Sequence, residues 1–137
     1  MITNMSNVVL PDAAATPVNQ TFTPASRVAE NTARWLSKPA NGSLLGAKVL
    51  QMSVREPADP ESGVYREIVT LAVPKLDLSV PSAPKLIGIG RAKVEFIFPA
   101  SFTTQEKKDL VKMFEQALLL GSATTLGDNI VDGSLPY

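Results

Sequence analysis

The spacing of apolar residues changes once along this chain, from every second residue to every third or fourth, just after Pro99. The stretch RAKVEFIFP, residues 91–99, alternates between apolar and polar side chains, which is typical of a β-strand with one buried face. The next segment begins with a candidate capping box, Thr103 to Glu106, and ends at Gly121, which predicts a helix of about four turns. Because the predicted strands precede the helices, the sequence predicts an α+β fold with an antiparallel sheet.

The chain is expected to form one domain over residues 1–137, because no repeat, low-complexity tract or linker interrupts it. Residues 7–24 predict an N-terminal β-hairpin, and residues 31–99 predict the sheet. Residues 103–137 are expected to hold the long helix, a short second helix and the C-terminus. For residues 25–38 the periodicity does not decide between a helix and a short strand.

Within the sheet, strands are expected at about residues 47–55, 64–74 and 91–99. Residues 75–90 contain two prolines as well as glycine and serine breaks. This composition predicts a long loop between the last two strands.

Composition excludes several kinds of site. The chain has no cysteine and no histidine, which removes disulfides, thiolate metal sites and the commonest general base. Thirteen basic residues balance thirteen acidic ones, so only a local concentration of charge would indicate nucleic-acid binding. No apolar run is long enough to span a membrane, and we expect no membrane, metal or cofactor. The mean hydropathy of +0.09 suggests that some surface is buried against partner chains.

Arg55 and Arg66 are expected to point to the same side of the sheet, because side chains alternate between the faces of a strand. If the apolar residues of the strands share one face, the polar ones share the other. We call that other side the basic face. It carries four cations and one carboxylate, which makes it a candidate surface for phosphate groups; the alternative is a solvated face. The basic face consists of Gln51, Ser53, Arg55, Arg66, Ile68, Thr70, Arg91, Lys93 and Glu95.

The apolar side of the sheet needs more cover than one helix can give. A second copy of the chain, supplying its helices across a two-fold axis, is the simplest solution. The helix residues expected in that dimer interface are Leu110, Met113, Phe114, Ala117 and Leu118.

The segments ARWLS, KVLQMSVRE, YREIVTLAVPK, KVEFIFP and GSLPY occur in this order over nearly the whole chain. In this order they resemble the coat protein of the small single-stranded RNA bacteriophages, the levivirus family. The resemblance implies an N-terminal hairpin, a five-stranded antiparallel sheet and two C-terminal helices, in an intertwined homodimer with one continuous sheet. It also implies an icosahedral shell, assembled in the bacterial host cytoplasm, that encloses genomic RNA against the inner sheet face. A stem-loop that represses replicase translation and a maturation protein are further implied partners.

Position by position, the family's RNA-facing residues fall on the basic face, and Ser53 and Arg55 match its SVR pattern directly. Arg91 stands where relatives often have a tyrosine that stacks on a base. Thr70 and Ile68 stand where relatives often have lysine and threonine. The loop at 75–90 corresponds to the family's assembly loop, which takes different conformations in different symmetry environments. Its central residues here are Val80, Pro81, Pro84 and Lys85.

Two other classes of function compete with this interpretation. An enzyme is disfavoured, because the SAPK sequence from Ser82 to Lys85 lacks the companion motifs of penicillin-recognising enzymes. The pair Asp59 and Glu61 is expected in a solvated turn, and Glu95 is expected to pair with Arg91 or Lys93. A non-viral RNA-binding α+β domain acting as a dimer remains an alternative, although such domains are mostly more basic.

Overall fold

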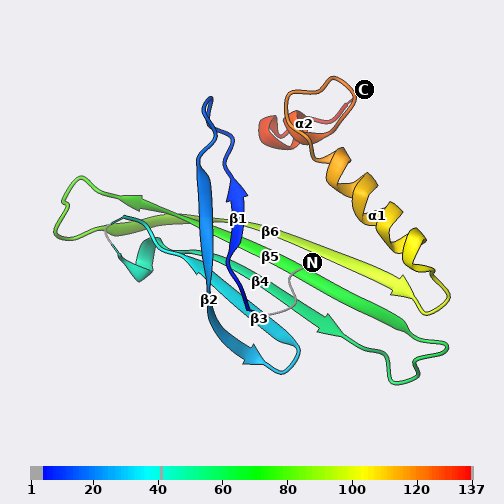
Figure 1. Cartoon of the computed structure of the whole chain (residues 1–137). Coiled ribbons are helices and arrows are strands. Elements are labelled where there is room, and N and C mark those ends of the chain that lie inside the picture. The colour runs from blue at the N-terminus through cyan, green and yellow to red at the C-terminus, as the bar shows by residue number, and fades with distance from the viewer. Residues whose placement is uncertain (1–4, 41, 137) are drawn as a thin grey trace.

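The structure is a computed structural model that describes residues 5–40 and 42–136, except for the side chains of residues 26–29. Six antiparallel strands form one sheet in chain order, and the helices follow (Figure 1). The predicted α+β order of elements is therefore confirmed. The elements are β1 (Val8–Pro11), β2 (Asn19–Ala29), β3 (Thr32–Ser37), the 3-10 turn η1 (Leu44–Gly46), β4 (Lys48–Arg55), β5 (Val64–Asp77), β6 (Lys85–Pro99), α1 (Thr104–Ala117) and α2 (Gly127–Asp132).

Strand β2 belongs to both the N-terminal hairpin and the main sheet. Its first half pairs with β1, as at Val8↔Phe22, and its second half pairs with β3 from Thr23↔Leu36 onward. Two register shifts interrupt the pairing with β3, and such bulges bend and twist a strand. The hairpin therefore stands away from the sheet (Figure 1). The expected hairpin and five-stranded sheet share this strand, which gives six strands in all.

The loop predicted at residues 75–90 is too long at both ends, so its predicted bounds are wrong. Lys75 pairs with Gly88 and Asp77 with Lys85, so β5 and β6 run further and residues 78–84 alone connect them. Glycines in β6 did not end the strand, because its backbone continues to pair with β5. The turn is closed by the Ser79 N–H, which donates to Asp77 Oδ1 at 2.9 Å. That hydrogen bond lowers the pKa of Asp77 below its usual value.

Helix α1 begins as the sequence predicts. The Thr103 hydroxyl accepts from the Glu106 N–H at 3.2 Å, and the Glu106 carboxylate accepts from the Thr103 N–H at 2.7 Å. The helix ends at Ala117, short of the predicted end, and Gly121 takes a left-handed φ of 72°. Asp128, in the first turn of α2, accepts from the Gly121 N–H at 3.0 Å. The connection between the two helices is therefore held by a side chain.

The isolated chain has almost no core. Among the described residues, the buried apolar side chains are Phe22, Trp35, Ala47 and Phe98. Trp35 packs there, and its Nε1–H donates to the Ser6 carbonyl at 2.9 Å. A chain of this length would ordinarily bury about two-thirds of its unfolded surface. The apolar surface of this one is therefore largely without cover in a single chain.

Helix α1 touches its own sheet along only one edge of its apolar stripe. The Phe114 ring meets Phe96 of β6 edge-to-face at 5.8 Å, and Lys107 Nζ lies 5.5 Å from the centre of the Tyr65 ring. Met113, on the far edge of the stripe, is 64% exposed. The helix rises away from the sheet towards α2 (Figure 1). Neither described helix is long and apolar enough to cross a membrane.

Candidate nucleic-acid interface

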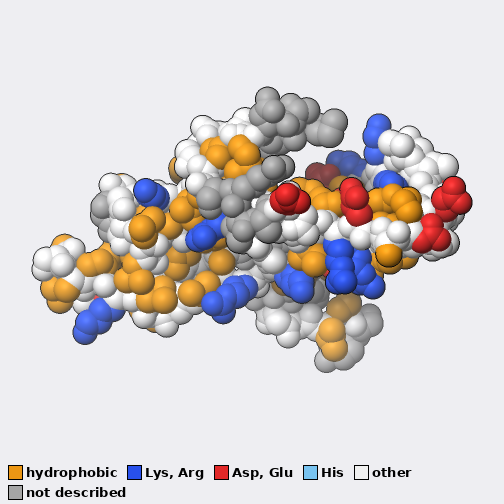
Figure 2. Space-filling view, turned by 90° about the horizontal axis from the view of Figure 1, so that it is seen from below, with side chains coloured by type: hydrophobic (Ala, Val, Ile, Leu, Met, Phe, Trp, Pro, Cys, Tyr) orange, Lys and Arg blue, Asp and Glu red, His pale blue; other side chains and the backbone are white. Residues whose placement is uncertain are grey.

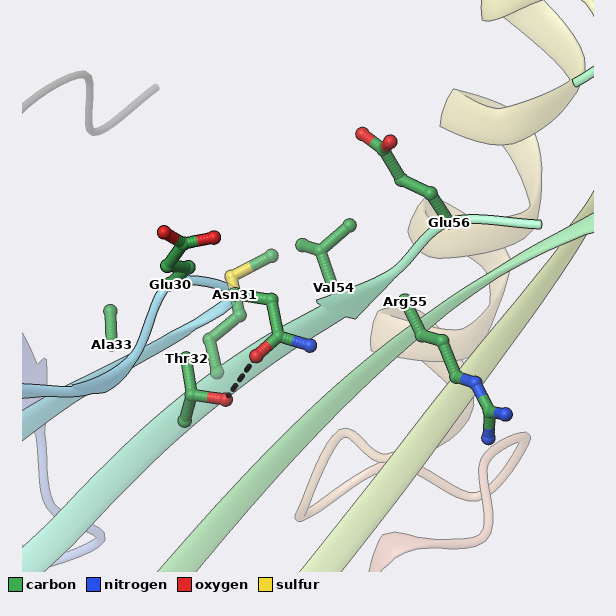
Figure 3. Close-up of a pocket in the computed structure, with 8 residues that line it drawn as sticks. Glu30, Asn31, Thr32, Ala33, Val54, Arg55 and Glu56 are labelled. Carbon is green, nitrogen blue, oxygen red and sulfur yellow. Dashed lines mark hydrogen bonds between the residues drawn. The ribbon is translucent and has the colours of Figure 1, made fainter. Parts of the chain in front are cut away.

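Strand register places all nine residues of the basic face on one side of the sheet, as their parity predicts. Directly paired residues on antiparallel strands lie on the same face. One rung contains Gln51, Thr70 and Lys93, and the next contains Ser53, Ile68 and Glu95. Arg55 pairs with Arg66, and Arg91 pairs with Ala72. Figure 3 shows Arg55 leaving β4 on the opposite side from Val54.

Arg55 and Arg66 form a pair of like charges at the end of β4 and β5. Like charges placed directly opposite each other are destabilising unless something neutralises them. Glu95 neutralises one of them, because its Oε1 lies 2.8 Å from Arg66 Nη1. Arg55 is exposed, and no described residue forms an ion pair with it. The pair therefore keeps an unneutralised guanidinium that an anion would stabilise.

The prediction that Glu95 pairs with Arg91 or Lys93 is wrong. Glu95 forms its ion pair with Arg66 instead of with Arg91 or Lys93, which lie on its own strand β6. Arg66 lies on β5, in the position diagonal to Glu95. A diagonal neighbour on the adjacent strand is within reach of a long side chain. Arg91 and Lys93 are both exposed and, within the described part of the chain, make no ion pair.

A depression of about 440 Å³ lies over the Arg55 end of the basic face. It is lined by two cations, Arg55 and Arg66, by two carboxylates, Glu56 and Glu95, and by apolar side chains that include Ile68. Guanidinium groups bind phosphate oxygens and stack on bases, while Ile68 offers an apolar contact. This combination fits a nucleotide better than a free inorganic anion.

A second depression, of about 570 Å³, opens at the ends of β3 and β4 (Figure 3). Two carboxylates, Glu30 and Glu56, line it together with Arg55, Met52 and Val54. In it the Thr32 hydroxyl donates to Asn31 Oδ1 at 3.2 Å. This depression holds two carboxylates to one cation, whereas the basic face holds four cations to one carboxylate, so the basic face remains the candidate interface. No group of three or more described acidic side chains could hold a metal ion.

Figure 2 views the molecule from below, the side away from the hairpin tip and α2 in Figure 1. Lys and Arg side chains are spread along this side, with apolar side chains between them (Figure 2). Asp and Glu side chains gather towards one end of this side (Figure 2).

Sequence reasoning missed two residues of this face, Thr32 and Arg34. Thr32 pairs with Ser53 and Arg34 pairs with Gln51, so both side chains join the basic face from β3. The signal was the alternation in TARWLS, which places Trp35 opposite them. It becomes decisive only once this segment is known to be a strand.

The predicted dimer-interface residues line one side of α1 and its C-terminal end. Leu110 and Ala117 are half-buried, whereas Met113, Phe114 and Leu118 are exposed in the single chain. Among the described residues the far edge of β6 is also unpaired, because β6 is the last strand of the sheet and pairs there with β5 alone. Long open edges of this kind are normally covered by another chain. The role of these residues in a dimer stays a prediction.

A single curved sheet with a projecting hairpin and two C-terminal helices is the architecture of small phage coat proteins. The virus-like particle of bacteriophage ESE058 matches with a TM-score of 0.84 and 25% identity, covering 98% of this chain and 99% of that one. The virus-like particle of bacteriophage NT-214 matches with a TM-score of 0.82 and 26% identity, covering 98% and 100%. A bacteriophage RNA-binding coat protein dimer, described as unassembled, matches with a TM-score of 0.68 and 24% identity, covering 97% and 98%.

The sequence model of the levivirus coat protein matches residues 3–137. The chain belongs to the levivirus coat protein family. Its function is that of a viral capsid protein, which sets aside the alternative of a non-viral RNA-binding domain. No curated protein matches the chain significantly. The terminal Tyr137, which contributed to the resemblance, lies outside the described residues.

Proposed function

We propose that this coat protein dimerises, assembles into an icosahedral shell and binds genomic RNA on the basic face. The observation that carries the RNA-binding role is the register, which collects Arg55, Arg66, Arg91 and Lys93 on one face with Glu95 as the single carboxylate among the nine. Phosphate contacts supply most of the sequence-independent affinity for nucleic acid. A face with a surplus of cations would therefore lie towards the RNA, and the helices on the other side would lie outwards.

A dimer would cover the two surfaces that the single chain leaves open, the edge of β6 and the apolar face of the sheet. The open edge of β6 would pair with the same strand of a second copy, continuing one sheet into the other, and each chain's α1 would cover the partner's apolar face. The exposure of Met113, Phe114 and Leu118 supports this arrangement. The match to a solved RNA-binding coat protein dimer supports it as well. Catalysis has no part in the proposal.

Translational repression would follow from tight binding of one stem-loop near the replicase start. Arg91, in place of an aromatic residue, would stack on a base through its guanidinium plane. Ser53 and Gln51 lie beside each other on β4 with uncharged polar groups that suit base edges. Packaging would take place in the host cytoplasm, with a maturation protein as a further component of the virion.

The protein expressed alone is expected to form closed particles that contain nuclease-protected RNA. Electron microscopy and light scattering of the purified protein would show their presence and size. Extraction after nuclease treatment would show whether RNA is enclosed. Particles without any RNA would contradict the RNA-binding role. A stable monomer or dimer that never assembles would contradict the shell.

The turn from residue 78 to 84 is expected to control assembly rather than folding. Val80 is 52% exposed, and the Ala83 N–H donates to its carbonyl at 2.9 Å, which closes the turn locally. Replacing Val80–Lys85 with a short Gly-Ser link should leave a folded dimer but change the size or yield of shells. Circular dichroism would check the fold, and electron microscopy the shells. Shells of normal size in full yield would show that the turn has no such role.

A further inference from the structure

The middle of β3 carries an arginine whose position on the sheet makes it part of the basic face. Arg34 pairs with Gln51, Gln51 pairs with Thr70, and Thr70 pairs with Lys93. These four residues form one rung across β3, β4, β5 and β6. Adjacent strands are about 4.8 Å apart, so the cations at its two ends are separated by roughly 14 Å. An amide and a hydroxyl lie between them.

Arg34 makes no ion pair with any residue in the described part of the chain. Its Nε is buried without a hydrogen-bond partner, and no described carboxylate lies within ion-pairing distance of its guanidinium. A buried donor without an acceptor lowers the stability of the fold, so this arginine is not retained for a bond that its Nε makes within the described residues. The guanidinium is therefore held on the basic face without a counter-charge among the described residues.

A phosphate oxygen is the acceptor that fits best. The guanidinium fork binds phosphate in a bidentate manner and is always charged. Nearby on the same face, Gln51 and Thr70 are uncharged and suit base edges or sugar hydroxyls. A strand of RNA that crosses this rung would meet a cation at each end and neutral polar groups between.

We propose that Arg34 is a further RNA-phosphate contact, which extends the binding surface of the coat protein from β4–β6 onto β3. The inference rests on the proposed RNA-binding function of the basic face. Arg34 is not one of the nine residues of the basic face that the sequence predicts, and it lies on a further strand, β3. The coat protein would therefore contact a longer stretch of RNA.

Arg34→Ala should make the plot of log affinity against log salt concentration shallower by about 0.7–0.9, the value for one phosphate contact. Arg34→Lys keeps the charge and should retain most of the slope. The probe is a synthetic RNA stem-loop of one fixed sequence, bound to the dimer in filter assays across a range of salt concentrations. Thermal melting of Arg34→Ala should occur at a temperature no lower than that of the parent protein, because the substitution removes a buried donor that makes no hydrogen bond within the described part of the chain.

A matched control is Lys108→Ala, which removes an exposed cation from α1 and should leave the slope unchanged. An unchanged slope for Arg34→Ala, beside a shallower slope for Arg55→Ala, would overturn the role of Arg34 and leave the proposed function intact. A parent protein that binds the stem-loop without salt dependence would instead overturn the proposed function. Normal RNA binding with impaired shell assembly in Arg34→Ala would assign the residue to a protein contact, against the proposal.

Discussion

Phe114→Asp should leave the chain insoluble or unable to dimerise. Phe114 packs edge-to-face on Phe96 at 5.8 Å yet remains 39% exposed in the single chain, so one side of the ring is available to a partner. In the proposed dimer that side would be buried. A carboxylate at this position would lose its hydration without gaining a cation, at a cost of several kcal/mol. Size-exclusion chromatography with light scattering at micromolar concentration would measure the result.

Gln116→Asp is the matched control for this prediction. It adds the same charge to the same helix, two residues further along, where the side chain is exposed and lies away from the apolar stripe. The Gln116→Asp protein should dimerise and assemble normally. If Phe114→Asp also gave a normal dimer, the exposed side of Phe114 would face solvent, and the proposed cover of the apolar face by α1 would be wrong.

Alternation and capping were sufficient to predict the part of the fold that positions the basic face. The parity of Arg55 and Arg66 fixed their common side, because neighbouring strands in register keep that parity. The capping box at Thr103 and Glu106 located the start of α1 to the residue. Both signals are local, so they do not depend on how the rest of the chain folds.

Features that depend on contacts between strands could not be predicted from the sequence alone. Gly88 and Gly90 suggested a loop, but pairing with β5 keeps them in β6. The segment around Trp35 is too short for periodicity to decide its structure, so Arg34 was missed. Parity placed Glu95 on the basic face, but only the relative position of β5 and β6 shows that Arg66 is its partner.

The balance of charge over the whole chain conceals an uneven distribution. Thirteen acidic residues equal thirteen basic ones, yet Glu95 is the only carboxylate among the nine residues of the basic face. Most other carboxylates lie in turns and on the helices, such as Asp59 in the β4–β5 turn and Asp109 on α1, and Glu67 on β5 has the opposite parity to Arg66. In a shell, this arrangement would place excess positive charge on the sheet side without making each subunit strongly basic.

Arg55→Ala combined with Arg66→Ala should weaken RNA binding and reduce its dependence on salt. Four phosphate contacts on the basic face would give a slope of log affinity against log salt of roughly −3 to −4, and removing two should make it shallower by about 2. Neither side chain is buried in the core, so the protein should stay folded. Filter binding of the dimer to an RNA stem-loop across salt concentrations would measure the slope.

Lys108→Ala combined with Lys112→Ala is the matched control. It also removes one cation without an ion pair and one that pairs with a carboxylate, since Lys112 Nζ lies 3.2 Å from Glu115 Oε2, but it removes them from α1. This control should keep the parent slope. Ser53→Ala or Gln51→Ala should change which stem-loop is preferred and leave the slope alone, because these side chains carry no charge. If the double arginine variant kept the parent's slope and affinity, Arg55 and Arg66 would not hold phosphates, and this face of the sheet would be only a solvated surface.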